Sequence, residues 1–192
     1  MRFSRFILLF VCIAAMSSCG GRQNANGVAG DTVSLSYARN ITIVRHDGFA
    51  EVTLLNPWKQ GQLLHRYILV PRADSARVAS PSEGTVVYTP VERSVVFSSP
   101  LCQLMVWLGA EKGLRGVCDA GYVHVPYVKQ KLKEGVVADC GSGMSPSVER
   151  IVALRPQALF VSPFENGSYG SVEQLGIPII ECADYMETSA LG

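Results

Sequence analysis

The spacing of hydrophobic and polar positions changes near residue 90. Before this point, short β-branched segments with alternating polarity follow one another, with turn residues between them, which predicts strands. Beyond it, short continuous apolar segments alternate with segments of helical spacing, a pattern typical of parallel strands joined by helices. The sequence therefore predicts a β-rich appendage over residues 31–90 and an α/β lobe over residues 91–192.

The appendage is expected to be antiparallel, because its links are too short for crossover helices. Asp47 and Gly48 form a turn signal, and Gly61 marks a second turn. We interpret Trp58 and Tyr67 as local core rather than as ligand contacts. The predicted strands are residues 33–38, 40–45, 49–55, 64–70 and 85–89.

The lobe is expected to form a doubly wound, mostly parallel sheet with helices on both faces. Its predicted strands are residues 94–97, 114–118, 136–138, 158–161 and 177–181, and Pro178 favours an edge position for the last of them. Its predicted helices are residues 100–108, 126–134, 146–155 and 171–175. Gly109 and Gly176 lie where C-terminal cap glycines belong, and residues from 187 onward resemble the start of another helix.

Two of the predicted helices begin with a serine followed by a proline. Ser99 and Ser145 are the expected N-caps, and the following prolines suit the first helical position. In the second helix Val148, Ile151 and Val152 form the apolar stripe, which leaves position 149 off it. Both helix starts could hold an anionic ligand group, but ordinary capping explains them without a ligand.

Ligands of parallel α/β sheets bind outside the carboxyl ends of the strands. The segments that follow the predicted strands are rich in serine, glycine, tyrosine and asparagine. Flat aromatic faces can pack on an apolar ligand surface, and hydroxyl or amide groups can orient a ligand. The alternative is that each side chain only packs within its own loop. The candidate ligand-binding residues are Ser98, Tyr122, Ser142, Phe164, Asn166 and Tyr169.

Composition and charge set further bounds. A chain of 192 residues, 48% apolar and 17% charged, can form one ordinary domain with an appendage and is unlike a disordered chain. Loss of Arg2 and Arg5 with a signal segment changes the net charge from +1 to −1. Because no predicted helix carries a cluster of lysine or arginine, we expect no nucleic-acid partner.

The first residues resemble a bacterial lipoprotein signal. Arg2 and Arg5 precede an apolar stretch over residues 6–15, which is too short to span a bilayer, and small residues then precede Cys19. Residues 1–18 are interpreted as the signal peptide, Cys19 as the lipidated first mature residue, and residues 19–30 as a flexible tether. The alternative is a plain secretory signal with a chance cysteine. Either places the protein in the periplasm or cell envelope, and the first anchors it to the membrane.

Motifs for metal binding and catalysis are weak. The three histidines lack zinc-site spacing, so we expect no direct metal site. Cys102, Cys118, Cys140 and Cys182 form no CxxC pair; buried thiols are the default, and one disulfide stays possible after export. The chain has no G-x-S-x-G turn. A small secreted α/β hydrolase or thiol enzyme, and a structural surface lipoprotein, remain alternatives to a binding function.

Several segments of the lobe together resemble the amino-terminal lobe of periplasmic substrate-binding proteins of ABC importers for iron chelates, haem and vitamin B12. The resemblance covers about residues 93–192. It is carried, in order, by Arg93-Ser94-Val95-Val96-Phe97-Ser98, Leu108-Gly109-Ala110, Gly116-Val117-Cys118-Asp119, residues 144–160 and Leu175-Gly176-Ile177-Pro178.

The resemblance implies a non-enzymatic receptor that needs no cofactor and captures an iron siderophore, haem or a corrinoid. Its partners would be an ABC permease with its ATPase, and the membrane through the lipid anchor. By the same match, Glu149 would dock onto the permease. Such receptors have a second lobe of similar size, so the chain is expected to be an amino-terminal half.

Overall fold

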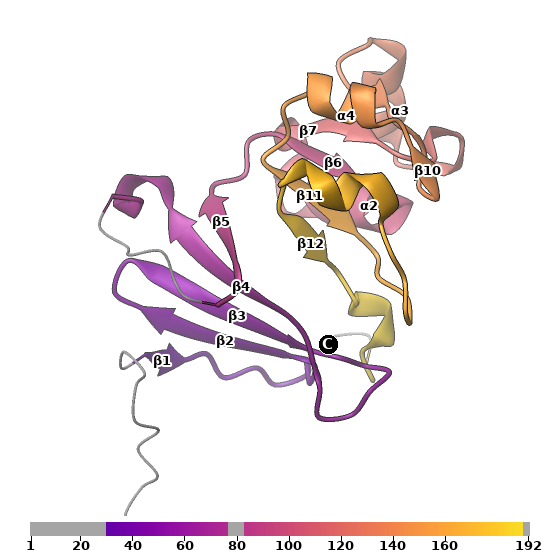
Figure 1. The fold of residues 1–192 in the computed structure, drawn as a ribbon. Coiled ribbons are helices and arrows are strands. Elements are labelled where there is room, and N and C mark those ends of the chain that lie inside the picture. The colour runs from indigo at the N-terminus through magenta and orange to yellow at the C-terminus, as the bar shows by residue number, and fades with distance from the viewer. Residues whose placement is uncertain (1–29, 77–82, 190–192) are drawn as a thin grey trace, which may run out of the picture.

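The computed structural model describes residues 30–76 and 83–189 (Figure 1). Two five-stranded sheets and one two-stranded hairpin form in this part of the chain. The first sheet, called the appendage sheet, contains β1 (Asp31–Thr32), β2 (Ile41–His46), β3 (Phe49–Leu55), β4 (Leu63–Pro71) and β5 (Thr85–Thr89). The second, called the parallel sheet, contains β6 (Ser94–Val96), β7 (Leu114–Val117), β8 (Ala138–Asp139), β11 (Ala158–Val161) and β12 (Ile179–Glu181). The prediction of an α/β chain with a parallel sheet is confirmed.

Along the chain, the three α-helices lie between successive strands of the parallel sheet. The α-helices are α2 (Ser99–Trp107), α3 (Pro126–Lys133) and α4 (Val148–Ala153). Short 3-10 helices are η1 (Arg72–Asp74), η2 (Glu111–Gly113), η3 (Ala120–Tyr122), η4 (Gly170–Leu175) and η5 (Asp184–Met186). The remaining hairpin pairs β9 (Gly141–Ser142) with β10 (Ser145–Pro146).

The appendage sheet follows the order β1-β2-β3-β4-β5, and its first four strands are antiparallel as predicted. The predicted strand over residues 33–38 is wrong. Strand β1 pairs with β2 only over Asp31 and Thr32, and Val33 adds one backbone hydrogen bond to Ile43. Beyond this point Leu35 and Tyr37 are exposed, so their alternation with polar residues does not mark a buried face.

Strand β5 contradicts the antiparallel prediction, because it pairs with β4 in parallel. The register joins Tyr67 to Thr85 and Pro71 to Thr89. The link between the two strands, residues 72–84, is long enough to carry the chain back to the start of β4 before β5 begins. Alternation within a strand does not reveal its direction, whereas the length of the link shows that a parallel pairing is possible.

The parallel sheet has the order β12-β11-β6-β7-β8, and all its strands run in the same direction. Strands β7 and β8 follow β6 on one side of it, and the later strands β11 and β12 lie on its other side. The order in which successive strands join the sheet therefore reverses between β6 and β11. Strand β12 is an edge strand, as Pro178 predicted.

Helices cover both faces of the parallel sheet. Val96 and Val117 pack in one cluster with Leu101 of α2 and Val128 of α3. On the other face, a second cluster joins neighbouring strand residues to α4 and η4; its buried members are Val95, Cys118, Cys140, Ile151, Leu159 and Val172. Since neighbouring valines in β6 enter different clusters, both faces of the sheet are buried, as its short apolar strands predicted.

Two predicted helix starts are displaced. Ser98, rather than Ser99, caps α2, and Ser147, rather than Ser145, caps α4 by accepting from the backbone N–H of Arg150. Ser145 and Pro146 belong instead to β10, where they pair with Ser142 and Gly141. The hairpin takes up the residues expected to start the helix, which shortens it.

The predicted apolar stripe of α4 is right only in part. Ile151 is fully buried and Val148 packs partly against the same cluster, but Val152 is half exposed. Leu154, just beyond the helix, packs there in its place. At about 100° per residue, Val148 and Leu154 each lie about 60° from Ile151 around the helix, whereas Val152 lies about 100° away from it and leaves the buried side.

The appendage sheet covers the edge of the parallel sheet. Figure 1 shows β12 of the lobe directed toward the appendage strands. The Tyr67 hydroxyl donates to the backbone oxygen of Ile179 at 3.0 Å and accepts from the N–H of Glu181 at 2.9 Å. Ile180 packs against the core of the appendage. One buried tyrosine thus satisfies backbone groups that an edge strand otherwise exposes.

The helix predicted from residue 187 onward does not begin within the described residues 187–189. The short helix η5 ends at Met186, and Glu187 has extended backbone angles. The Glu187 carboxylate accepts from the backbone N–H groups of Arg39 and Asn40, at distances from 3.0 to 3.2 Å. This contact joins the end of the described lobe to the start of β2.

The segments at the amino terminus stay predictions. The proposed signal peptide (1–18), the lipidated Cys19 and the tether up to residue 29 lie outside the described residues. None of the helices found over residues 30–76 and 83–189 has both the length and the apolar character needed to cross a bilayer.

Candidate functional site

A hollow of about 280 Å³ lies at the carboxyl ends of β6, β7 and β11. It lies between β6 and β11, where the strand order reverses, and open α/β sheets bind ligands at such a reversal. We call it the rim hollow. Its lining residues are Phe97, Asp119, Gly143, Met144, Val161, Ser162, Phe164, Ser168, Tyr169 and Gly170.

One wall of the rim hollow depends on a close approach between Asp119 and Gly143. Asp119 follows β7 in a left-handed conformation (φ 52°), and its Oδ2 accepts from the Gly143 N–H at 3.0 Å. A Cβ at position 143 would lie 2.7 Å from that oxygen. A side chain at position 143 would therefore disturb this contact, which holds the β9–β10 hairpin over the end of β7.

Ser98 and Ser162 join the ends of β6 and β11. Ser162 Oγ lies 3.3 Å from Ser98 Oγ, and Ser98 caps α2 by accepting from the backbone N–H of Leu101. Ser162 itself lines the rim hollow, whereas Ser98 lies one contact behind it. The predicted residue Ser98 therefore supports the wall by capping α2, and Ser162 presents its hydroxyl to the hollow.

A second hollow of about 220 Å³ adjoins the first and shares Phe164 and Tyr169 with it. We call it the interface hollow, because residues of the β3–β4 loop form its opposite side. Its lining residues are Asn56, Trp58, Lys59, Leu64, Pro163, Phe164, Glu165, Asn166, Gly167, Tyr169 and Glu181. Phe164 is 48% exposed, so a ligand in either hollow can cover its ring.

Tyr169 is held by carboxylates at both ends. Its hydroxyl donates to Glu181 Oε1 at 3.0 Å, and its backbone N–H donates to Glu173 Oε1 at 2.6 Å. Burial, followed by the charge of Glu181, raises the pKa of the Tyr169 phenol well above its usual range. The phenol therefore stays protonated and remains a donor.

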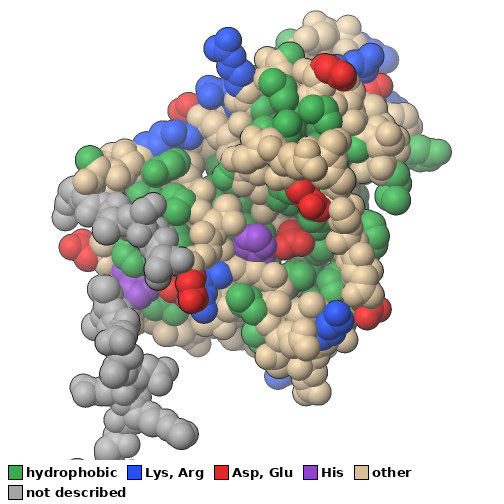
Figure 2. Space-filling model, viewed as in Figure 1, with side chains coloured by type: hydrophobic (Ala, Val, Ile, Leu, Met, Phe, Trp, Pro, Cys, Tyr) green, Lys and Arg blue, Asp and Glu red, His purple; other side chains and the backbone are tan. Residues whose placement is uncertain are grey.

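Glu181 connects this tyrosine to the appendage. Its Oε2 lies 3.1 Å from His65 Nδ1, and the other ring nitrogen of His65 lies 2.8 Å from Thr85 Oγ1. The carboxylate is only 14% exposed. Figure 2 shows a histidine side chain beside acidic side chains at the middle of the molecule, where the two parts meet. The site thus has an ordered polar side, formed by both parts.

The structure brings together half of the predicted site residues. Phe164 and Tyr169 line both hollows, and Asn166 lines the interface hollow. Tyr122 is 76% exposed in η3, outside the residues that line the hollows, and Ser142 turns its hydroxyl to the backbone N–H of Met144 at 3.2 Å. The ligand-binding roles of all these residues stay predictions.

Other lining residues were not singled out from the sequence. Asp119, Met144 and Ser162 belong to the predicted rim segments, so their place after a strand was the available signal. Trp58 and Lys59 come from the appendage, and no local pattern places them at the lobe. Tyr67 is buried in the core as predicted. Trp58, which was also expected in the local core, instead lines the interface hollow.

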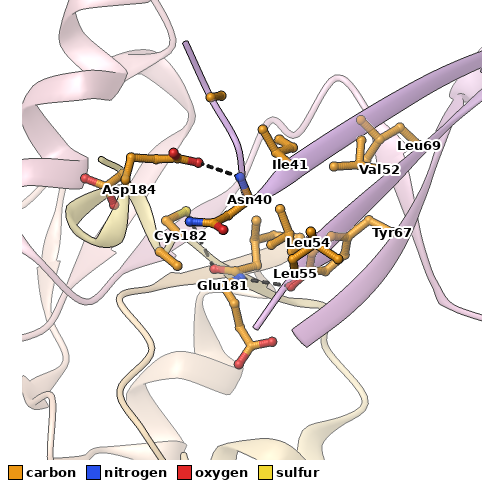
Figure 3. Close-up of a pocket in the computed structure, with 14 residues that line it drawn as sticks. Asn40, Ile41, Val52, Leu54, Leu55, Tyr67, Leu69, Glu181, Cys182 and Asp184 are labelled. Atoms are coloured by element: carbon orange, nitrogen blue, oxygen red, sulfur yellow. Dashed lines mark hydrogen bonds between the residues drawn. The ribbon is translucent and has the colours of Figure 1, made fainter. Parts of the chain in front are cut away.

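A third and larger hollow of about 340 Å³ lies between the appendage sheet and the segment after β12 (Figure 3). Its walls are mainly apolar, with Ile41, Val52, Leu54, Leu69 and Ile180 among the lining residues. Figure 3 shows the polar groups of Asn40 and Asp184 gathered at one end. Although Tyr67 and Glu181 also line it, its surface is almost wholly apolar, whereas the other two hollows combine the exposed ring of Phe164 with several polar groups, so we place the candidate site at those.

The described residues offer neither a metal-binding cluster nor a cysteine activated as a nucleophile. Among residues 30–76 and 83–189, no three histidine, cysteine or acidic side chains are grouped so as to hold a metal ion. Cys102, Cys118, Cys140 and Cys182 are free thiols, and the first three are buried. Burial raises the pKa of Cys102, Cys118 and Cys182 to about 12. A reactive cysteine needs a lowered pKa, so these are structural thiols, as the default interpretation held.

Comparison with known proteins gives the following. The chain is 25% identical over 220 residues to an uncharacterized lipoprotein, MJ0878, of Methanocaldococcus jannaschii. The alignment covers 97% of this chain and 53% of that protein. The chain thus spans about half the length of the curated relative it matches. No family model matches the chain.

Two solved structures are similar over about half of the chain. The petrobactin-binding protein YclQ from Bacillus subtilis covers 50% of this chain and 32% of its own, with 24% identity and a TM-score of 0.40. The periplasmic heme-binding protein HutB of Vibrio cholerae covers 47% of this chain and 33% of its own, with 24% identity and a TM-score of 0.36.

Proposed function

We propose that the chain is the substrate-binding part of an envelope receptor that captures an iron siderophore, haem or a corrinoid. The observation that carries this proposal is the rim hollow at the carboxyl ends of β6, β7 and β11. Numbered along the chain, the strands of the parallel sheet have the order 3-2-1-4-5, which agrees with a doubly wound lobe. In such lobes the crevice between the first and fourth strands receives the ligand.

The chemistry of the two hollows supports a binding role. Phe164 and Tyr169 present aromatic faces, and Ser162 with Asn166 offers hydroxyl and amide groups. A few polar groups beside aromatic surface are typical of sites that orient a small molecule. The buried thiols argue against a thiol enzyme, since none is activated as a nucleophile.

The proposal extends to delivery. The lipoprotein signal and the residues that resemble iron-chelate and vitamin B12 receptors support lipid attachment at Cys19 and transfer to an ABC permease with its ATPase. Glu149 is exposed in the first turn of α4 and accepts from the Ser147 hydroxyl at 3.3 Å, so its carboxylate is available at the surface for docking.

The test is isothermal titration of the purified chain with haemin, cyanocobalamin and a ferric siderophore. We expect saturable binding of at least one, and about tenfold weaker binding after Phe164→Ala, which corresponds to about 1.4 kcal/mol and is near the upper range for an aromatic contact. Tyr37→Ala is the control, because it removes an exposed aromatic ring outside both hollows. If none of the three classes binds, the proposal is wrong.

A further inference from the structure

The β3–β4 loop of the appendage lies against the rim loop of the lobe. Lys59 Nζ donates to Asn166 Oδ1 at 3.3 Å, across 107 positions of sequence. The interface hollow lies between these two loops, with Trp58 and Lys59 on one side and Phe164 and Glu165 on the other. A wall of this site therefore comes from outside the parallel-sheet lobe.

The β3–β4 loop has an ordered conformation of its own. Asn56 Oδ1 accepts from the backbone N–H groups of Trp58 at 3.0 Å and of Lys59 at 2.9 Å. The Asn56 N–H donates to the Gln62 oxygen at 2.8 Å, and Gly61 takes a positive φ of 75° to close the turn. An asparagine side chain that caps its own turn preorganises the residues that follow it. Trp58 and Lys59 are thus positioned before any ligand arrives.

The strand after this loop fixes the appendage to the same site. Tyr67 of β4 bonds to the backbone of Ile179 and Glu181, and His65 of β4 lies 3.1 Å from the Glu181 carboxylate. That carboxylate also accepts from Tyr169, which lines both hollows. Because the contacts converge on Glu181, the two walls of the interface hollow are held in one arrangement.

The side chains of this hollow select the class of ligand. Trp58, Phe164 and Tyr169 offer aromatic surface, and Lys59 offers an ammonium donor. Glu165 and Glu181 bring two carboxylates to the same lining. A ligand with several negative charges would be repelled by these groups, whereas a flat ligand of low net charge with an acceptor oxygen fits them.

We propose that the β3–β4 loop is the second wall of the ligand site, where Trp58 packs on the ligand and Lys59 donates to one of its oxygens. The ligand is a macrocycle or chelate of low net charge with a flat apolar face. This inference rests on the proposed function and assigns the appendage a part in it.

The first experiment compares affinities by isothermal titration with cyanocobalamin, ferrioxamine B and ferric enterobactin. We expect the first two, which are neutral and singly cationic, to bind more tightly than the triply anionic third. For the probe that binds, Trp58→Ala is expected to weaken the affinity about tenfold and Lys59→Gln about threefold to tenfold. The controls are Trp107→Ala, which removes an indole that is 73% exposed, and Lys112→Gln, in η2 before β7.

A second measurement does not depend on comparing variants that fold differently. The chain has two tryptophans, so Trp107→Phe leaves Trp58 as the fluorescent reporter. Acrylamide must touch an indole to quench it, and bound ligand is expected to reduce the quenching constant of Trp58 at least twofold. In Trp58→Phe, ligand should leave the quenching of Trp107 unchanged.

The outcomes separate the two proposals. If the parent chain binds none of the probes, haemin included, both the proposed function and this inference fail. If it binds a probe and Trp58→Ala binds as tightly as Trp107→Ala, with no protection of Trp58 from acrylamide, the receptor function stands and the second wall is wrong. Tightest binding of ferric enterobactin would overturn the assigned ligand class.

Discussion

The hydroxyl of Tyr67 accepts a hydrogen bond from the backbone N–H of Glu181, 2.9 Å away, and donates to the oxygen of Ile179. The side chain is 3% exposed, and burial raises the pKa of its phenol above the usual range. One side-chain oxygen therefore takes the place of a neighbouring strand at the edge of the parallel sheet. This contact joins the two sheets and leads to the first prediction.

Tyr67→Phe is expected to lower the free energy of unfolding by about 1–3 kcal/mol, because the partly buried Ile179 C=O and Glu181 N–H lose their partner. Urea denaturation followed by circular dichroism measures the change. Tyr88→Phe is the control, since Tyr88 lies in the same sheet and is 45% exposed. Equal stability of the two variants would show that the hydroxyl does not hold the sheets together.

Packing behind the rim hollow gives a second prediction. A Cβ at Gly116 in β7 would lie 2.6 Å from Cys140 Sγ and 2.7 Å from Leu154 Cδ1. Gly116→Ala should therefore cost about 1–3 kcal/mol by overpacking. Gly121→Ala is the matched control, because a Cβ there meets no heavy atom within 4 Å. A destabilisation of the control as large as that of Gly116→Ala would contradict this account.

The buried thiols predict a loss of stability at high pH. Burial, followed by the nearby charge of Asp139, raises the pKa of Cys140 to about 11, and burial raises that of Cys118 to about 12. An unfolded cysteine has a pKa of about 8.5. The folded state thus holds these protons more tightly, so their contribution is complete below about pH 8.5 and is lost as the pH rises through the folded values.

Denaturation at a series of pH values measures this loss. We expect the free energy of unfolding to fall between about pH 9 and 11, and less steeply in Cys140→Ala. Alkylation of the native chain at pH 8, mapped by mass spectrometry, should label Cys118 and Cys140 far more slowly than in urea. Rapid labelling of the native chain would mean that these thiols are open to solvent.

Glu149 gives a prediction about delivery. Glu149→Gln keeps an acceptor for the Ser147 hydroxyl while it removes the charge. We expect unchanged ligand affinity and stability, but slower ligand transfer and weaker stimulation of the permease ATPase in reconstituted vesicles. Ser147→Ala is the control for the cap: it should lower stability by about 1 kcal/mol and leave docking unaffected. Full transfer by Glu149→Gln would remove this residue from the docking surface.

A prediction for the rim hollow follows from the contact of Asp119 with Gly143. Gly143→Ala places a carbon 2.7 Å from Asp119 Oδ2, so either this carboxylate rotates away from the position 143 N–H or the β9–β10 hairpin shifts from the end of β7. We expect weaker ligand binding with a small change in overall stability, since the hairpin lies at the surface. Titration calorimetry and urea denaturation separate the two effects, and unaltered affinity would exclude this wall from the site.

Much of the candidate site follows from where the strands end, which local patterns indicate well. Apolar strands such as β11 are recognisable because each is continuous and bounded by turn residues, and their carboxyl ends identify the rim loops. Phe164 and Tyr169 were found in this way. Tyr122 belongs to a rim loop too, yet it is exposed, because a position after a strand does not decide the direction of a side chain.

The sequence alone determined most of the alternation of strands and helices in the lobe, though not the β9–β10 hairpin, and that β12 is an edge strand, because these depend on neighbouring residues and on proline and glycine at fixed places. Only the tertiary structure decided that β5 runs parallel to β4, that Ser147 rather than Ser145 caps α4, and that Tyr67 covers the edge. It also brought Trp58 and Lys59 to the rim loop. These relations depend on contacts between distant segments, and packing selects among arrangements that the local pattern leaves equally possible.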